Sequence, residues 1–142
     1  MNQPMTGYHF RVNWGKTPIQ FKEVSGLEIR TDVIEYRTGE DKEYTPRKMP
    51  GMIHYGNIRL TRGVMPADNE FFEWWNTLKM NKIDRRDMTI SLLNEEHDPV
   101  MVWKIARAFP VSLKWDRLEA SENRIFLEHL EVATERITVQ ND

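Results

Sequence analysis

The strongest constraint on the fold of this chain is an alternation of apolar and polar residues that recurs along most of its length. In the segment 8–14, Tyr-His-Phe-Arg-Val-Asn-Trp, the even positions are apolar and the odd positions are polar. Successive side chains of a β-strand point to opposite faces, so this pattern predicts a strand with one buried face. The alternation returns at 27–36, 57–64, 88–92, 101–115 and 125–139. We therefore expect a mainly β fold.

Irregularities in the alternation predict how the strands are shaped. After Val33 the apolar phase shifts to Ile34 and Tyr36. Such a shift indicates a bulge or twist of the kind that bends a sheet toward a barrel. Pro110 interrupts another apolar run, which predicts a break or an edge position. Residues 94–99 are rich in turn formers and predict a hairpin loop.

One segment, at about 68–80, has helical spacing instead. Phe71, Trp75 and Leu78 recur at helical intervals, and Asp68 suits the N-cap of a short amphipathic helix. We expect its aromatic face to lie against a sheet. Adjacent helical residues point roughly 100° apart, so Trp74 and Trp75 cannot both face one core. Trp74 is therefore a candidate for contact with another chain.

Size and composition are those of a single folded domain. The chain has 142 residues, of which 39% are hydrophobic and 30% are charged, with no cysteine. We expect one domain over residues 1–142, made in a reducing compartment and without disulfides. The formal net charge of −2 gives no bulk attraction to nucleic acid or to anionic membranes.

Targeting and membrane signals are also missing from the sequence pattern. The N-terminal segment has neither a basic region nor an apolar core of the kind found in signal peptides. The longest apolar runs fall far short of the roughly 20 residues of a spanning helix. We expect assembly in the cytoplasm and no membrane insertion by the monomer. The protein would then leave the cell by lysis or within a larger particle.

No catalytic or metal-binding pattern is evident. The four histidines, His9, His54, His97 and His129, fall in separate predicted elements and lack metal-ligand spacing. Ser25 lacks the glycine frame of a nucleophile elbow. We expect no enzyme activity, no metal site and no cofactor, so the residues leave a binding module or a structural subunit.

The segment at about 38–52 is expected to be an extended loop. It is polar and contains two prolines and two glycines, and it is too long for a simple turn. Tyr44, Met49 and Met52 are sizeable apolar groups within it. We expect this loop to be mobile in a monomer and to become ordered against a partner.

Short segments resemble, in order along the chain, those of the phage tail tube family. They are Phe-Lys-Glu-Val-Ser-Gly-Leu at 21–27, Ile-Glu-Tyr-Arg at 34–37, Lys-Met-Pro-Gly at 48–51, Ile-Arg-Leu-Thr-Arg-Gly at 58–63, Glu-Phe-Phe-Glu-Trp-Trp at 70–75 and Ala-Phe-Pro at 108–110. Within that family the chain is most similar to the inner tube proteins of extracellular phage-tail-like contractile injection systems.

The resemblance implies a fold and an assembly. The fold is two packed antiparallel sheets that form a small barrel or sandwich with one flanking helix. The assembly is a homo-hexameric ring whose copies stack into a hollow tube, propelled by sheath contraction, with sheath and baseplate proteins as partners and cargo in the lumen. Specific nucleic-acid binding is not expected. The final location is a phage-tail-like particle, virion-like or released from the cell.

Two sets of residues follow from the resemblance. The inter-subunit contact candidates, with Trp74, are Tyr44, Arg47, Lys48, Met49, Pro50, Gly51 and Met52. The lumen-facing candidates are Asn57, Arg59 and Thr61. Residues 44–51 and 71–75 also resemble tube-initiator proteins, which join tube to baseplate, so that role stays open beside the major tube. A third alternative, of a different class, is a monomeric β-barrel ligand carrier.

Overall fold

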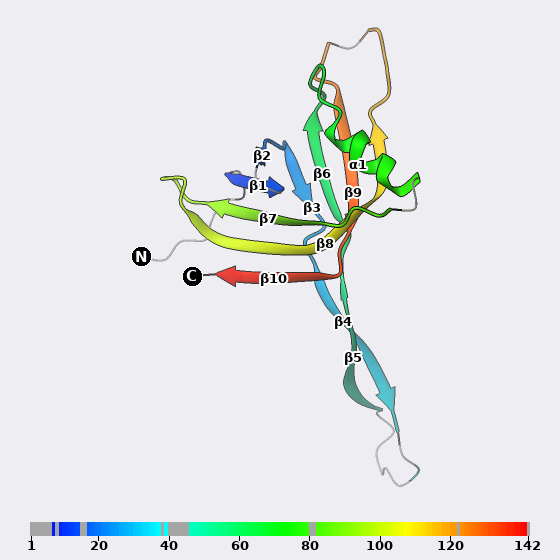
Figure 1. Ribbon diagram of the computed structural model, residues 1–142. Coiled ribbons are helices and arrows are strands. Elements are labelled where there is room, and N and C mark those ends of the chain that lie inside the picture. The colour runs from blue at the N-terminus through cyan, green and yellow to red at the C-terminus, as the bar shows by residue number, and fades with distance from the viewer. Residues whose placement is uncertain are drawn as a thin grey trace.

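The structure of the protein is a computed structural model, and it describes residues 7, 9–14, 17–37, 39, 46–79, 82–121 and 123–141. Ten strands and one helix follow one another along the described chain (Figure 1). They are β1 (Phe10–Trp14), β2 (Thr17–Ile19), β3 (Glu23–Ser25), β4 (Ile29–Tyr36), β5 (Arg47–Tyr55), β6 (Ile58–Gly63), α1 (Glu70–Lys79), β7 (Arg86–Leu93), β8 (Pro99–Trp115), β9 (Leu127–Ala133) and β10 (Arg136–Asn141). The predicted mainly β class with one helix is confirmed.

The strands form one bent antiparallel sheet with a separate two-stranded hairpin. The strand order is β2-β1-β7-β8-β9-β6-β3, with β10 also paired to β8, while β4 pairs only with β5. The 17 residues of β8 take part in both halves of the bent sheet. Its first part pairs with β7 and β10, and its second part pairs with β9. The predicted pair of packed sheets therefore shares one long strand.

The bend in β8 lies at Arg107, whose φ of 53° is in the left-handed region that side chains other than glycine rarely adopt. Two interactions hold it there. The backbone N–H of Arg107 donates to Oδ1 of Asp87 at 2.9 Å, and the guanidinium contacts Glu135 at 2.9 Å. Of the two predicted roles of Pro110, a break or an edge position, the structure shows the edge, because this part of β8 pairs only with β9 among the described strands. Pro110 is fully buried beside an irregularity in the β8–β9 register, where a strand tolerates proline.

The core lies between the inner faces of the two halves of the sheet. The register places Val12, Ile90 and Trp103 in one row across β1, β7 and β8. Leu60 and Leu130 form a facing row on β6 and β9. These alternate residues are the ones that the period-two pattern predicts to be buried. Val12, Leu60, Ile90 and Leu130 belong to a single hydrophobic cluster, against which Trp103 packs.

Helix α1 packs its aromatic side chains into this core, as predicted. Phe71 and Trp74 are buried, and Trp14 of β1 contacts both rings. The carboxylate of Asp68 accepts the backbone N–H of Glu70 at 3.1 Å, so it satisfies one of the free amides at the start of the helix.

The interpretation of Trp74 as a contact with another chain is wrong. Its side chain is 0% exposed, and its ring lies edge-on to Trp14 at 4.5 Å. The indole Nε1 donates a hydrogen bond to the carbonyl of Asp84 at 2.6 Å. Sequence spacing assigned the core face to Trp75, but Trp75 is only partly buried. The helix is rotated about its axis relative to the predicted orientation.

The expectation of a loop over about 38–52 is wrong for the C-terminal part of that segment. Residues 47–52 lie in β5 and pair with β4 in the hairpin that projects from the body of the molecule (Figure 1). Tyr44, at the centre of the predicted loop, lies outside the described residues. The phase shift after Val33 reflects a real irregularity, because the β4–β5 register shifts between Thr31 and Val33.

Replacing Trp74 by alanine is expected to lower the free energy of unfolding by about 3–5 kcal/mol, because it empties the space of a fully buried aromatic ring. Trp75→Ala is the matched control, and it should cost about 1 kcal/mol because its side chain is only partly buried. Urea unfolding followed by circular dichroism measures both. Equal losses in the two variants would contradict this orientation of the helix.

Candidate functional site

Two surfaces of the described chain carry side chains that take no part in packing the core. One is the outer face of the β3-β6-β9-β8 half of the sheet, called here the polar face. The other is the β4–β5 hairpin. The two differ in chemistry, since the first is dense in hydrogen-bonding groups and the second exposes large apolar side chains.

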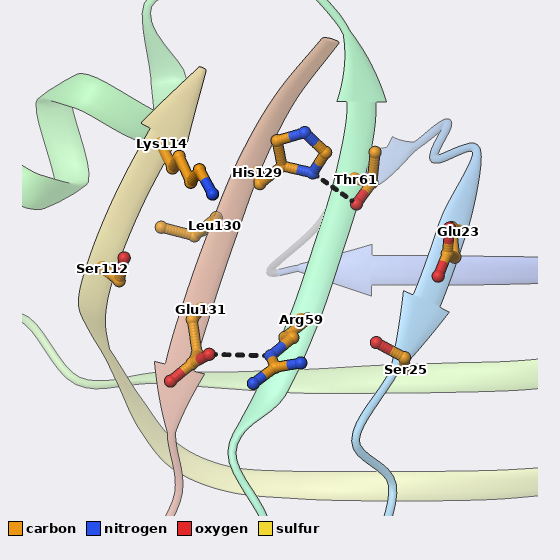
Figure 2. A pocket seen from close by; sticks show the side chains of 9 residues that line it. All are labelled: Glu23, Ser25, Arg59, Thr61, Ser112, Lys114, His129, Leu130 and Glu131. Carbon is orange, nitrogen blue, oxygen red and sulfur yellow. Dashed lines mark hydrogen bonds and ion pairs between the residues drawn. The ribbon is translucent and has the colours of Figure 1, made fainter. Parts of the chain in front are cut away.

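The polar face is built by the register of four strands. Strand pairing places opposite residues on the same side of a sheet, so alternate positions form rows across it. One row contains Glu23, Thr61, His129 and Lys114, and the next contains Ser25, Arg59, Glu131 and Ser112. Figure 2 shows these side chains around a shallow hollow of about 500 Å³, which Leu130 also lines.

Arg59 and Glu131 form the charged centre of the polar face. Nε of Arg59 donates to Oε1 of Glu131 at 2.9 Å, and Nδ2 of Asn57 donates to Oε2 at 3.1 Å. These two hydrogen bonds, that from Arg59 first, hold the pKa of Glu131 below its ordinary value. The structure thus brings together Asn57 and Arg59, two of the residues predicted to face a lumen.

His129 links three strands at the other end of the hollow. Its Nδ1 lies 3.0 Å from Oγ1 of Thr61 on β6, and its Nε2 lies 2.9 Å from Oδ1 of Asp116, just past the end of β8. The hydrogen bond with His129 is the main reason that the pKa of Asp116 is lowered. Thr61, the third predicted lumen residue, is thus on the polar face but is almost covered.

Thr61, His129 and Asp116 supply the hydroxyl, imidazole and carboxylate groups of a nucleophilic triad. Their surroundings, however, are not those of a catalytic triad. A triad needs an exposed nucleophile and free backbone amides that can stabilise an oxyanion. Thr61 is 7% exposed, and in the middle of β6 it pairs with Glu23 on one side and His129 on the other. The arrangement therefore functions as a cross-strand link.

Within the described ranges, no group of three or more histidine, aspartate or glutamate side chains is placed to hold a metal ion. None of the helices in the described part of the chain combines the length and the apolar character needed to cross a membrane.

The hairpin exposes apolar side chains along one of its two faces. The register places Ile29, Thr31 and Val33 on one face together with Ile53 and Pro50. Exposed fractions along this face are 50% for Ile29, 59% for Val33 and 61% for Ile53. Every residue of β4 is exposed, although its alternation predicted one hydrated face and one apolar face for a strand within a sheet.

The opposite face of the hairpin is polar near the body of the molecule. Nε2 of His54 lies 2.7 Å from Oδ2 of Asp32. A side chain at Gly51 would meet Asp32 and Ile34 at 3.2 Å, so glycine allows the two strands to approach at the register shift. Gly26, with φ of 86°, holds the base of the hairpin because a Cβ there would lie 2.0 Å from the carbonyl oxygen of Asn57.

The structure places most of the predicted contact residues along β5. Arg47, Lys48, Met49, Pro50 and Met52 are exposed there. Gly51 lies between them and is partly buried.

Sequence reasoning missed most of the polar face, namely Glu23, Ser25, Ser112, Lys114, His129 and Glu131. The sequence did contain one signal. Leu130 and Val132 are apolar and are predicted to face the core, so the alternation places His129 and Glu131 on the outer face. The register between strands, which joins them to Thr61 and Arg59, was not readable from the sequence.

Comparison with known proteins identifies the family. The sequence profile of the T4-like virus tail tube protein gp19 matches residues 6–138. The chain belongs to this tail tube family. None of the curated proteins compared with the chain matches it.

Solved structures of tail-tube relatives share the whole fold. A chain of the PVC sheath–tube complex, an extracellular contractile injection system in its extended state, is 36% identical with a TM-score of 0.89, over 98% of this chain and 93% of that one. A chain of the anti-feeding prophage (AFP) tube terminating cap is 34% identical with a TM-score of 0.92, over 100% and 94%. A chain of the AFP baseplate is 26% identical with a TM-score of 0.88, over 99% and 98%. The chain is thus a tail tube protein similar to those of contractile injection systems.

Asp116→Asn is expected to lower the free energy of unfolding of this tail tube protein at neutral pH but not in acid. The folded pKa of Asp116 lies below the unfolded value of about 3.9, so its carboxylate stabilises the fold above that pH. This stabilisation is lost as the pH falls through the folded pKa. Urea unfolding from pH 7 to pH 2 should therefore show a gap between variant and wild type that closes below about pH 4. Glu96→Gln, in the exposed β7–β8 turn, is the control, and a gap that persists unchanged to pH 2 would contradict the role of Asp116.

Proposed function

We propose that this tail tube protein is a structural, non-catalytic subunit of the inner tube of a contractile injection particle. It forms hexameric rings that stack into a hollow tube. The observation that carries the proposal is the β4–β5 hairpin, whose paired strands present Ile29, Val33 and Ile53 to solvent. A two-stranded hairpin with a bare apolar face is marginally stable by itself, so it requires a covering surface from another chain.

Free strand edges support the same proposal. Among the described strands, β2 and β3 lie at the two ends of the sheet path, and β10 pairs on one side with β8. Exposed edges offer unpaired backbone groups that invite pairing with another chain. Joining of edges between subunits would satisfy these groups and build one continuous sheet around a ring.

The polar face suits the lumen of such a ring. Asn57, Arg59 and Thr61 lie on it, and its central charges are paired within the subunit. A surface of paired charges and hydroxyl groups remains hydrated and offers little apolar area to which cargo could adhere. We assign the lumen to this face, with cargo passing over it.

The proposed role within the particle is that of the major tube. Identity to the chain of the PVC sheath–tube complex is 36%, against 26% to the chain of the AFP baseplate. This difference favours the major tube over an initiator ring at the baseplate, with sheath and baseplate proteins as neighbours. Assembly in the cytoplasm, followed by presence in a released particle, fits relatives from extracellular injection systems.

The open sheet argues against a monomeric ligand carrier. A carrier closes its own barrel around an internal cavity. Here the described strands form an open path that begins at β2 and ends at β3, and the hollow of the polar face lies on the outer side of one half. Electron microscopy of the purified chain over a concentration series tests the proposal. Six-fold rings or stacked tubes are expected, and a monomer at every concentration would refute it.

Val33→Asp is expected to weaken ring and tube formation while the domain stays folded, because it places a charge on the apolar face of the hairpin, where Val33 is 59% exposed. Burial of an unpaired carboxylate in a subunit interface is costly, so assembly should weaken at least tenfold. Sedimentation velocity measures assembly and circular dichroism measures folding. Ile83→Asp, at a residue of similar exposure outside the hairpin, is the matched control and should assemble.

Amide hydrogen exchange provides an independent test of the hairpin. The amides of residues 47–52 should exchange quickly in the monomer, because the hairpin has no covering layer, and at least tenfold more slowly in assembled tubes. Core amides such as those of β9 should exchange slowly in both states. Equally slow exchange of the hairpin in both states would show that it needs no partner.

A further inference from the structure

Two histidines from distant parts of the sequence meet at the outer end of the β1-β7-β8 half of the sheet. His9 directly precedes β1, and His97 lies in the turn between β7 and β8. Their ring centres are 5.2 Å apart, and the ring planes are inclined by 59°. Figure 1 shows the β7–β8 turn at the end of this half, on the side where β1 begins. Sequence spacing did not reveal the pair, because it forms only through the pairing of β1 with β7.

Backbone hydrogen bonds hold both histidines in place. The carbonyl of His9 accepts the N–H of Leu93 at 2.8 Å, which fixes the start of β1 against the end of β7. The N–H of His97 donates to the carbonyl of Asn94 at 3.0 Å, and Oδ1 of Asn94 accepts the N–H of Asp98 at 2.9 Å. The two imidazoles therefore project from backbone that the fold has already ordered.

The turn also places negative charge around the two imidazoles. Glu95, Glu96 and Asp98 are the sequence neighbours of His97, whereas residues 94–99 contain no lysine or arginine. An excess of one charge sign raises the local concentration of ions of the opposite sign. The surroundings of the histidine pair thus favour a cation.

The separation of the two rings fits two ligands of one metal ion. A histidine nitrogen binds Zn²⁺ at about 2.0–2.1 Å, which places the centre of its ring about 3.2 Å from the ion. Two such rings at a tetrahedral angle have centres about 5 Å apart. The observed 5.2 Å agrees with this value. A half-turn about the Cβ–Cγ bond exchanges the two edges of an imidazole, so a nitrogen of each ring can face the shared position.

We propose that His9 and His97 form a two-histidine site for a first-row transition-metal ion such as Zn²⁺ or Cu²⁺. Imidazole is a ligand that suits both ions. Water completes the coordination, because the described ranges hold no group of three or more metal-ligating side chains. The ion joins the start of β1 to the β7–β8 turn, and it stabilises the folded chain because it binds that state alone. This inference is independent of the proposed tube function.

Isothermal titration calorimetry of the untagged protein with ZnCl₂ at neutral pH tests the site. His97→Asn is the principal variant, because asparagine, like histidine, adopts the left-handed backbone found here, with φ of 64°. His97→Asn and His9→Gln should each weaken Zn²⁺ binding at least tenfold. His54→Gln, on the β4–β5 hairpin, is the matched control and should bind as the wild type does. Circular dichroism checks that each variant is folded.

The outcomes of the titration are decisive for the site. Unchanged Zn²⁺ affinity in both variants would mean that the two rings make an aromatic contact only. A loss in one variant but not in the other would mean that a single histidine holds the ion. Either result would overturn the site and leave the tube function intact, since that function is tested by the rings and tubes seen in electron micrographs.

Electron paramagnetic resonance with Cu²⁺ counts the nitrogen ligands in the wild-type protein. Hyperfine splitting from two imidazole nitrogens is expected, and from one nitrogen in His97→Asn. This measurement decides the question even if a variant fails to fold, because a wild-type spectrum with fewer than two nitrogen ligands would contradict the proposal.

Discussion

The rest of the structure depends on the bend of a single strand. Strand β8 is long enough to belong to both halves of the sheet, and it turns between them at Arg107, where an unfavourable backbone conformation is held by Asp87 and Glu135. Because one strand serves both halves, their inner faces are brought opposite each other and share one core. Helix α1 seals that core with Phe71 and Trp74.

A buried ionic cluster fixes where the helix begins. Arg62 is 4% exposed, and its Nε donates to Glu128 at 2.6 Å while its terminal nitrogens reach Asp68. Its guanidinium also lies 4.0 Å from the ring centre of Phe71. Loss of one partner from such a cluster leaves a buried charge uncompensated, which typically costs about 3–5 kcal/mol. The same Asp68 caps the helix, so the cluster couples the sheet to α1.

The domain completes its own core but leaves the apolar side chains of the hairpin exposed. Large apolar side chains that are not covered within the monomer gather on the β4–β5 hairpin, where Ile29, Val33 and Ile53 are exposed. On the polar face, in contrast, Arg59 is paired with Glu131 and His129 with Asp116. The proposed tube function requires such a division, with apolar surfaces against neighbouring subunits and a hydrated lumen.

The class of the fold could be predicted from the sequence, because alternation and helical spacing are local properties. The sequence also identified the one helix, the capping role of Asp68 and the register irregularity near Val33, and its motifs indicated the tail tube family. Only the tertiary structure decided that Trp74 and not Trp75 faces the core, since a small rotation of a helix exchanges adjacent side chains. The contacts of Thr61 with His129 and of Arg59 with Glu131, and the strand formed by residues 47–52, also follow only from the tertiary structure. Pairing between distant segments depends on a register that no local pattern encodes.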